Sequence, residues 1–208
     1  MSTLKIVIFD CDGVMFDSRD ANRHYYNHLL EHFGHPAMDD DELQYVHTHS
    51  VKDSVAHIFR GYPAEQVEAV HRYRQRHSYI PYLDYMTIEP DLKEFLHFLR
   101  PAHYTAISTN RTSTMPALLE KYGLPPLFDM VVTAQDVQNP KPHPEALIKI
   151  LDHFALQAHQ ALFIGDSDID REHASGLDMR FAAYKSPSLQ ADFHVDSFMQ
   201  IAGLPLFA

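Results

Sequence analysis

Residues 4–14 read LKIVIFDCDGV, and this stretch decides the fold class. Residues 4–9 are mostly apolar and rich in β-branched side chains, as is typical of a strand buried on both faces. The run ends at two acidic residues, Asp10 and Asp12, and at Gly13, which suits a tight turn. We therefore expect a buried strand that presents two carboxylates at its carboxyl end.

Four further strand-like runs follow this stretch, and amphipathic helical patterns lie between them. Residues 91–99, 115–122 and 145–154 each place their apolar side chains on one helical face. Alternation of strands and helices predicts an α/β fold, with a mostly parallel, Rossmann-like sheet covered by helices on both faces. The expected strands are residues 103–108, 129–133, 161–164 and 179–183.

One segment breaks the alternation. Residues 18–85 contain no convincing strand and resemble three or four helices, of which 20–33, 53–59 and 64–80 are the clearest. An all-helical insert after the first strand predicts a small helical cap subdomain over residues 18–85. Residues 1–17 and 86–208 would then form the Rossmann-like core.

Composition narrows the possible functions. The formal net charge of −11, with histidines neutral, argues against binding to nucleic acids or anionic membranes. Cys11 is the one cysteine, so an internal disulfide is excluded. We find neither a secretory signal nor an apolar run of membrane-spanning length. These features predict a soluble, cytoplasmic protein. We expect a monomer or homodimer, although nothing in the composition distinguishes the two states.

Polar side chains follow four of the expected strands. In open parallel sheets ligands bind outside the carboxyl ends of the strands, so these side chains should converge. Carboxylates are hard oxygen ligands suited to Mg²⁺, and a carboxylate can also attack phosphorus. A metal ion and a lysine neutralise phosphoryl oxygens. The groups are Asp10 and Asp12, Thr109 and Asn110, Lys141 between two prolines, and Asp166 to Asp170.

These residues resemble the four motifs of the haloacid dehalogenase-like superfamily. The motifs are FDCDGV at 9–14, TN at 109–110, KPHPE at 141–145 and GDSDID at 165–170. They occur in order, at suitable spacing, over nearly the whole chain. The helical insert is similar to the C1-type cap of the phosphoglycolate phosphatase and β-phosphoglucomutase branch. The resemblance implies a Mg²⁺-dependent enzyme that acts on a small phosphorylated metabolite.

The resemblance also implies roles for the motif residues. Asp10 would be the nucleophile, and Asp12 the general acid and base. Lys141 would neutralise charge and position Asp10, while Thr109 and the N–H of Asn110 would hold phosphoryl oxygens. The implied Mg²⁺ ligands are Asp10, Asp12 through its carbonyl, Asp166, and Asp170 directly or through water.

Each motif residue also has a structural interpretation. Asp10 and Asp12 are good turn formers, and Thr109-Asn110 would suit a helix N-cap. Lys141 could be a solvated loop lysine, but its flanking prolines favour a rigid placement, with a cis bond before Pro142. The joint presence of all four motifs favours the chemical interpretation.

Asp12 separates the reaction classes within the family. Dehalogenases lack the second aspartate, and phosphonatases use a cap lysine, so Asp12 favours phosphate monoesters. Residues 47–54 align best with the cap specificity loop, which makes His49 and Lys52 candidate substrate-binding residues. A polar loop flanking a helix is the structural alternative. The mutases carry an arginine near position 51 that is absent here, which favours a phosphatase over a β-phosphoglucomutase-like mutase.

The non-enzymatic alternative is a phosphoryl-receiving or scaffold module. Receiver domains share the acidic cluster, the Mg²⁺ ion, the threonine and the lysine. They lack a helical cap, and their phospho-aspartate should persist. Because Asp12 provides a general acid and base, the sequence favours turnover.

Overall fold

The computed structural model describes residues 4–207. The chain divides into two compact units, which we describe separately. The sheet unit comprises Met1–Phe16 and Ile88–Ala208, and the helical unit comprises Asp17–Thr87. Where the chain passes from one unit to the other, β2 (Phe16–Asp17) and β3 (Thr87–Ile88) pair as a two-stranded sheet. Within residues 4–207 no helix combines the length and apolarity that crossing a bilayer requires.

The sheet unit contains a six-stranded sheet in the order β5-β4-β1-β6-β7-β8. Each neighbouring pair runs parallel, which confirms the fold class predicted from strand–helix alternation. The edge strand β8 (Phe193–Val195) was not expected, because its three residues include His194 and lie between Asp192 and Asp196, so no continuous apolar run marks them. The other five strands lie within a residue or two of the predicted runs: β1 (Ile6–Phe9), β4 (Tyr104–Ser108), β5 (Met130–Val132), β6 (Ala161–Gly165) and β7 (Arg180–Tyr184).

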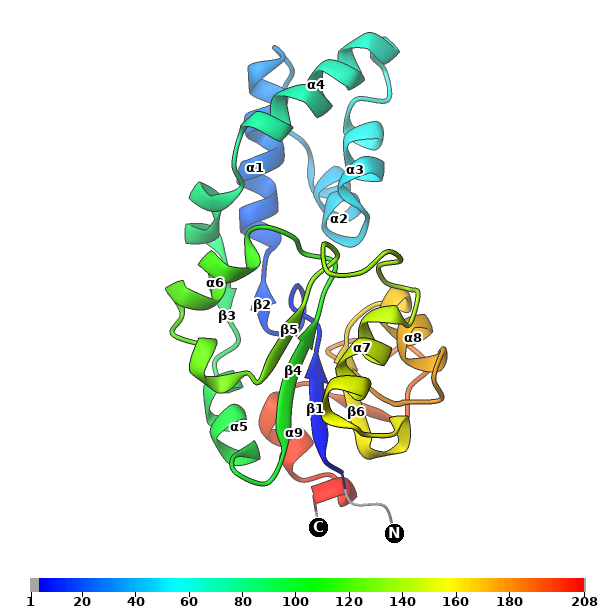
Figure 1. Cartoon of the computed structure of the whole chain (residues 1–208). Helices are drawn as coiled ribbons and strands as arrows, with labels where there is room; N and C mark the ends of the chain where they lie inside the picture. Colours follow the sequence, from blue (N-terminus) through cyan, green and yellow to red (C-terminus); the bar gives the residue numbers. More distant parts are fainter. Residues whose placement is uncertain (1–3, 208) are drawn as a thin grey trace. The chain divides into compact units, whose positions relative to one another are not determined.

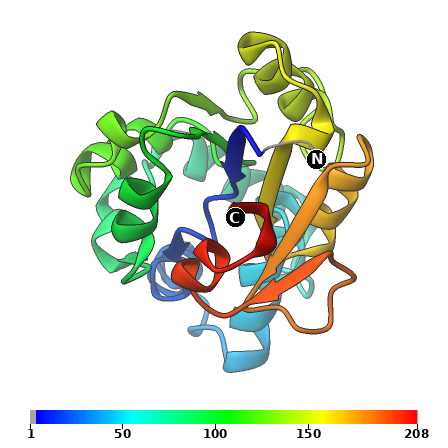
Figure 2. The same cartoon turned by 90° about the horizontal axis from the view of Figure 1, so that it is seen from below.

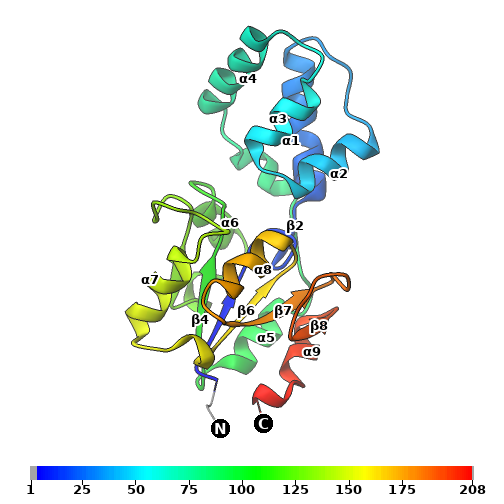
Figure 3. The same ribbon diagram turned by 90° about the vertical axis from the view of Figure 1, so that its right-hand side faces the viewer.

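Helices cover both faces of this sheet (Figure 1). Figure 3 shows α7 (Glu145–Phe154) and α8 (Asp168–Ser175) on one face, with α5 (Leu92–Leu99) and α9 (Phe198–Ala202) on the other. The remaining helix of the unit is α6 (Met115–Lys121). Short 3₁₀ turns complete the unit at Pro125–Leu127, Ala158–Gln160 and Pro205–Phe207.

Alternate side chains of the central strand β1 pack on opposite faces of the sheet. Ile6 and Ile8 belong to the buried cluster that includes Leu147 of α7. Phe9 lies on the opposite face, where its ring centroid is 6.1 Å from that of Phe95 in α5. Burial on both faces holds β1 in the middle of the sheet, as Figure 2 shows in blue beside β6 in yellow. The residues that follow β1 therefore lie at the centre of the carboxyl edge.

The helical unit contains α1 (Arg19–His32), α2 (Asp40–Thr48), α3 (Val51–Ile58) and α4 (Ala64–Arg76). Its core includes Leu29, Leu43 and Phe59, one from each of three segments of the unit. Helix α2 was not among the helices identified most clearly. Its start is set by a capping box in which Asp39 and Glu42 accept hydrogen bonds from each other's backbone N–H.

Two expectations for this unit were wrong. Residues 47–54 do not form a loop, because α2 continues to Thr48 and only His49 and Ser50 separate it from α3. The Ser50 side chain accepts from the N–H of Asp53 and so starts α3 immediately. The helix expected over 64–80 ends at Arg76, and a 3₁₀ turn over Ile80–Tyr85 follows. Pro81 lacks the N–H that a continuing α-helix would use.

Candidate active site

Lys141 joins two carboxylates inside the sheet unit. Its Nζ lies 2.6 Å from Asp10 Oδ1 and 2.6 Å from Asp170 Oδ1. The three side chains are at most 10% exposed, so none of these charges is screened by bulk water. Asp10 follows β1, Lys141 follows β5 and Asp170 lies in α8. The structure thus brings together three predicted site residues that are distant in sequence.

A second group of carboxylates offers a metal site. Asp10, Asp166 and Asp170 each present one ligand oxygen, and these oxygens lie within 4.8 Å of one another. Hard carboxylate oxygens at this density suit Mg²⁺. Together with Asp12, the ionised carboxylates would exceed the two neighbouring cations, Lys141 and Arg111, by two charges. A divalent cation would balance that excess, so the residues present fit the ion.

The pKa values show where the excess negative charge lies. Burial, reinforced by the charge of Asp170, raises the pKa of Asp10 to about 7 despite the nearby Lys141. Burial and the charge of Asp10 raise the pKa of Asp166 to about 8. Burial alone would raise the pKa of Asp170 too, but Lys141 and the Ser167 hydroxyl outweigh it and lower that pKa. Asp10 and Asp166 are therefore the carboxylates that a cation would relieve most.

Lys141 remains charged in this environment. Burial alone would lower the pKa of its ammonium group, but the carboxylates of Asp10 and Asp170 outweigh burial and raise it. A permanently protonated lysine beside Asp10 is suited to neutralising a phosphoryl group.

The turn after β6 places Asp166 and Asp170. Gly165 ends the strand, and a Cβ there would lie 2.4 Å from the Asp170 Cβ, so a larger residue would displace that side chain. Ser167 then caps α8, and its hydroxyl donates to Asp170 Oδ2 at 2.7 Å. The backbone N–H of Asp166 donates to the same oxygen at 3.2 Å. The sequence GDSDID therefore both starts α8 and fixes its acidic side chains.

Gly13 allows the first and last motifs to approach each other. Its φ is +80°, a backbone conformation that residues other than glycine rarely adopt. A Cβ at this position would lie 2.0 Å from Asp166 Oδ2. Glycine is therefore required both by the turn and by the carboxylate packed against it.

Asn110 supports the lysine loop through its side chain. Its Oδ1 accepts from the Lys141 N–H at 3.0 Å, and its Nδ2 donates to the Lys141 carbonyl at 3.1 Å. Thr109, which precedes it, is buried and its Oγ1 accepts from the backbone N–H of Arg111 at 3.1 Å. The Lys141–Pro142 bond is cis, as expected. The second motif thus contacts the third directly.

Arg111 was missed in the sequence interpretation. Its guanidinium pairs with the Asp12 carboxylate through two nitrogens, one of them Nε at 3.0 Å. The available signal was a cationic residue immediately after the TN motif.

His173 was also missed. It is fully buried, its Nε2 lies 2.9 Å from the Ser108 hydroxyl and its Nδ1 lies 2.8 Å from the His143 carbonyl. Burial, aided by the positive charge of Lys141, lowers its pKa to about 4. The available signal was its position one helical turn after Asp170 in α8, which places both on the same face.

Cys11 behaves as a small buried hydrophobe. It is fully buried, and burial raises the pKa of its thiol well above the ordinary value. The thiol therefore stays protonated and is a poor nucleophile.

His49 and Lys52 lie in the helical unit. The His49 ring stacks on Tyr45 with centroids 3.7 Å apart, and its Nδ1 lies 2.9 Å from the Tyr45 carbonyl. Lys52 is exposed on α3. Their assignment as substrate-binding residues stays a prediction.

Comparison with known proteins places this site in a family. Residues 7–184 match the family model for haloacid dehalogenase-like hydrolases. Pyrophosphatase PpaX of Bacillus pumilus is 25% identical, over 95% of this chain and 92% of that protein. A phosphoglycolate phosphatase of Aliivibrio fischeri is 27% identical, over 83% and 81%. The crystal structure of a Geobacter sulfurreducens HAD-superfamily hydrolase of subfamily IA superimposes with a TM-score of 0.85 at 35% identity, covering 96% of this chain and 95% of that one.

Proposed function

Because the chain belongs to the haloacid dehalogenase-like hydrolase family, we propose that it is a Mg²⁺-dependent phosphatase of a small phosphomonoester, with Asp10 as the nucleophile. The observation that supports this most is the buried Lys141 held 2.6 Å from Asp10, beside the cluster that Asp166 and Asp170 complete. Phosphoryl transfer needs a nucleophile, fixed positive charge and a place for a divalent cation, and these residues supply all three.

The proposed reaction has two steps. An oxygen of Asp10 attacks phosphorus, and the bond from phosphorus to the ester oxygen breaks. That oxygen keeps the electron pair and takes a proton from the Asp12 carboxyl. Water then attacks the phosphorus of the aspartyl-phosphate and gives a proton back to Asp12, while the Asp10 oxygen leaves with its electron pair. Thr109 and the N–H of Asn110 would hold phosphoryl oxygens throughout.

The metal site follows from the same residues. Asp10, Asp166 and the carbonyl of Asp12 would hold Mg²⁺, with Asp170 acting directly or through water. When bound, the ion would supply charge neutralisation for the phosphoryl oxygens. Lys141 would balance the remaining charge of the two carboxylates that it contacts.

The helical unit would act as a cap that selects the substrate. His49 and Lys52 are the candidate residues, since a cation and an imidazole can recognise an anionic or hydroxylated leaving group. The same proposal includes a cytoplasmic location and a monomeric or homodimeric state, and size-exclusion chromatography with light scattering would measure the latter.

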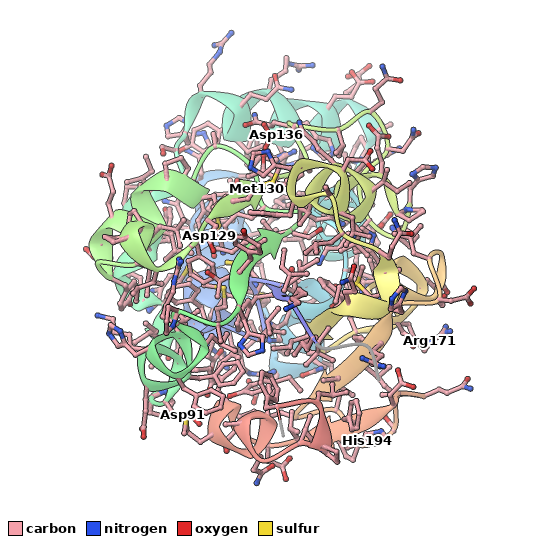
Figure 4. All side chains as sticks on the ribbon, turned by 60° about the horizontal axis from the view of Figure 1, so that its bottom comes forward. Asp91, Asp129, Met130, Asp136, Arg171 and His194 are labelled. Atoms are coloured by element: carbon pink, nitrogen blue, oxygen red, sulfur yellow. The ribbon has the colours of Figure 1, made fainter. Side chains whose placement is uncertain are left out.

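The test is Mg²⁺-dependent release of phosphate from p-nitrophenyl phosphate. We expect activity in the wild type, loss with EDTA, and a fall to background in Asp10→Asn. Asp168→Asn is the matched control, because Asp168 belongs to the last motif but pairs only at the surface, with Arg171 at 3.0 Å (Arg171 is labelled in Figure 4). Retained activity in purified, folded Asp10→Asn would refute the mechanism.

A panel of substrates would then resolve the reaction. It should contain phosphoglycolate, inorganic pyrophosphate and a sugar 1-phosphate with a bisphosphate activator. We expect release of phosphate to dominate. Isomerisation of the sugar phosphate faster than release of phosphate would instead establish a mutase.

A further inference from the structure

Arg111 holds both oxygens of the Asp12 carboxylate. Its Nε donates to Oδ2 at 3.0 Å and its Nη2 donates to Oδ1, while its Nη1 donates to the Thr114 hydroxyl at 3.1 Å. The Arg111 side chain is only 8% exposed, whereas that of Asp12 is 37% exposed. The guanidinium is thus enclosed and engaged through all three nitrogens, and the carboxylate that it holds reaches solvent.

We propose that Arg111 is a positioning residue, which orients the Asp12 carboxyl for proton transfer to the leaving group. This inference rests on the proposed function, in which Asp12 is the general acid and base. A two-pronged arginine–carboxylate contact fixes the plane of the carboxyl group as well as its place. Orientation matters because displacement of a catalytic group by about 1 Å can cost roughly a hundredfold in rate.

The contact leaves Asp12 able to carry a proton. Each carboxylate oxygen has two acceptor sites, so the two bonds from Arg111 occupy one site on each oxygen. The contact with Arg111 therefore does not by itself prevent either oxygen from carrying the proton that passes to the leaving group or arrives from water. Arg111 therefore restricts the directions from which that proton can be delivered.

The fold explains how Arg111 reaches Asp12. The two residues follow β4 and β1, which pair in parallel with Phe9 opposite Ile107. The backbone of Arg111 is held at both ends, because its N–H donates to Thr109 Oγ1 at 3.1 Å and its carbonyl accepts from the Ala134 N–H at 3.3 Å. The loop that would bind the phosphoryl group thus also orients the acid.

A substrate-binding role for Arg111 is the main rival. An arginine near a phosphate site can bind a second anionic group of a substrate. The burial of this side chain and the engagement of Nε, Nη1 and Nη2 argue against that role.

The leaving group of the substrate provides a direct test. Phenyl phosphate and p-nitrophenyl phosphate have similar shape, but phenolate needs protonation on departure far more than p-nitrophenolate does. We would measure kcat/KM of both esters, with Mg²⁺, for the wild type, Arg111→Gln and Arg111→Lys. The ratio of phenyl to p-nitrophenyl ester should fall about tenfold or more in Arg111→Gln. Lysine keeps the charge but cannot form the two-pronged contact, so Arg111→Lys should also lower the ratio.

Arg100→Gln is the matched control. Arg100 pairs with Asp129 at 2.8 Å in the same unit, at the start of β5, where Figure 4 labels Asp129. Its loss should lower stability and leave the ratio unchanged. An equal fall of both esters in the Arg111 variants would overturn the proposal. So would a rise confined to the KM of substrates with a second anionic group.

Crystal structures provide a readout that does not need activity. In Arg111→Gln the Asp12 side chain should move away from its wild-type position or adopt several conformations. An unchanged Asp12 carboxylate in that variant would overturn the inference, whether or not any ester is hydrolysed. Failure of the proposed function would be recognised separately, by a wild type that releases no phosphate or by an active Asp10→Asn.

Discussion

His173 should make the stability of the sheet unit fall in mild acid. Its Nδ1 faces a carbonyl, which can only accept, so Nδ1 carries the hydrogen and Nε2 accepts from Ser108 in the neutral ring. Burial lowers the pKa from 6.5 to about 4, because the enclosed ring and the nearby Lys141 both disfavour a second proton. The perturbation that we propose is His173→Gln, which removes the titrating group.

The size of the effect follows from the difference in pKa. In the unfolded chain the ring takes up a proton near pH 6.5, but in the folded chain it does so only near pH 4. Between these two pH values the unfolded state binds more protons than the folded state. The contribution of the neutral ring to the free energy of unfolding is therefore fully present above pH 6.5 and is lost as the pH falls toward 4. One unit of pKa corresponds to about 1.4 kcal/mol, so the loss across the window is about 3 kcal/mol.

Urea unfolding at a series of pH values would measure this loss. The free energy of unfolding of the wild type should fall by about 3 kcal/mol more than that of His173→Gln between the two pKa values. The comparison is between slopes, so a constant loss of stability in the variant does not affect it. His153→Gln, at an exposed position on α7, is the control and should follow the wild type. Parallel profiles for the wild type and His173→Gln would refute the reasoning.

Three further predictions concern the carboxylate cluster. Gly13→Ala should abolish hydrolysis of p-nitrophenyl phosphate, because its Cβ would meet Asp166 Oδ2 at 2.0 Å. Gly123→Ala, at φ +65° with open space around it, should cost only about 1–2 kcal/mol of stability and keep the activity; equal activity in the two variants would contradict this account. Lys141→Met should lower the free energy of unfolding in EDTA by about 3 kcal/mol or more, because its two carboxylate partners stay buried without a cation; an unchanged urea midpoint would be evidence against it. Mg²⁺ should raise the melting temperature of the wild type in a concentration-dependent way, and Asp166→Asn should weaken that rise. A calorimetric scan that shows the same rise in both proteins would exclude Asp166 as a ligand.

The parallel character of the sheet and five of its six strands could be predicted, because each of those five strands has a local signature. β1 and β6 are fully buried runs, and β4 is buried from Thr105 onward. All three end at polar motifs, and alternation with helices implied parallel pairing. Elements with weak local signals were missed or misplaced. The three residues of β8 include His194 and lie between two aspartates, so they form no apolar run. Residues 47–54 showed a polar composition that fits a loop as well as two helix ends.

The candidate site divides in the same way. Asp10, Lys141 and Asp170 could be predicted to converge, because the carboxyl ends of parallel strands meet at one edge. The hydrogen bonds between Asn110 and the backbone of Lys141 could not be predicted, since such contacts depend on the exact path of two loops. Arg111 and His173 stand next to or near recognised motifs, but nothing in their spacing indicated which atoms they contact.

The sequence by itself determined the alternation of five strands with helices, the acidic and basic residues at the strand ends, and the family to which the chain belongs. These are properties of local pattern and residue chemistry. Only the tertiary structure decided that Arg111 holds Asp12, that His173 is enclosed in its neutral form and that Gly13 must accommodate Asp166. The physical reason is that pairing, burial and close approach depend on distances between segments far apart in the chain, and side-chain packing sets those distances.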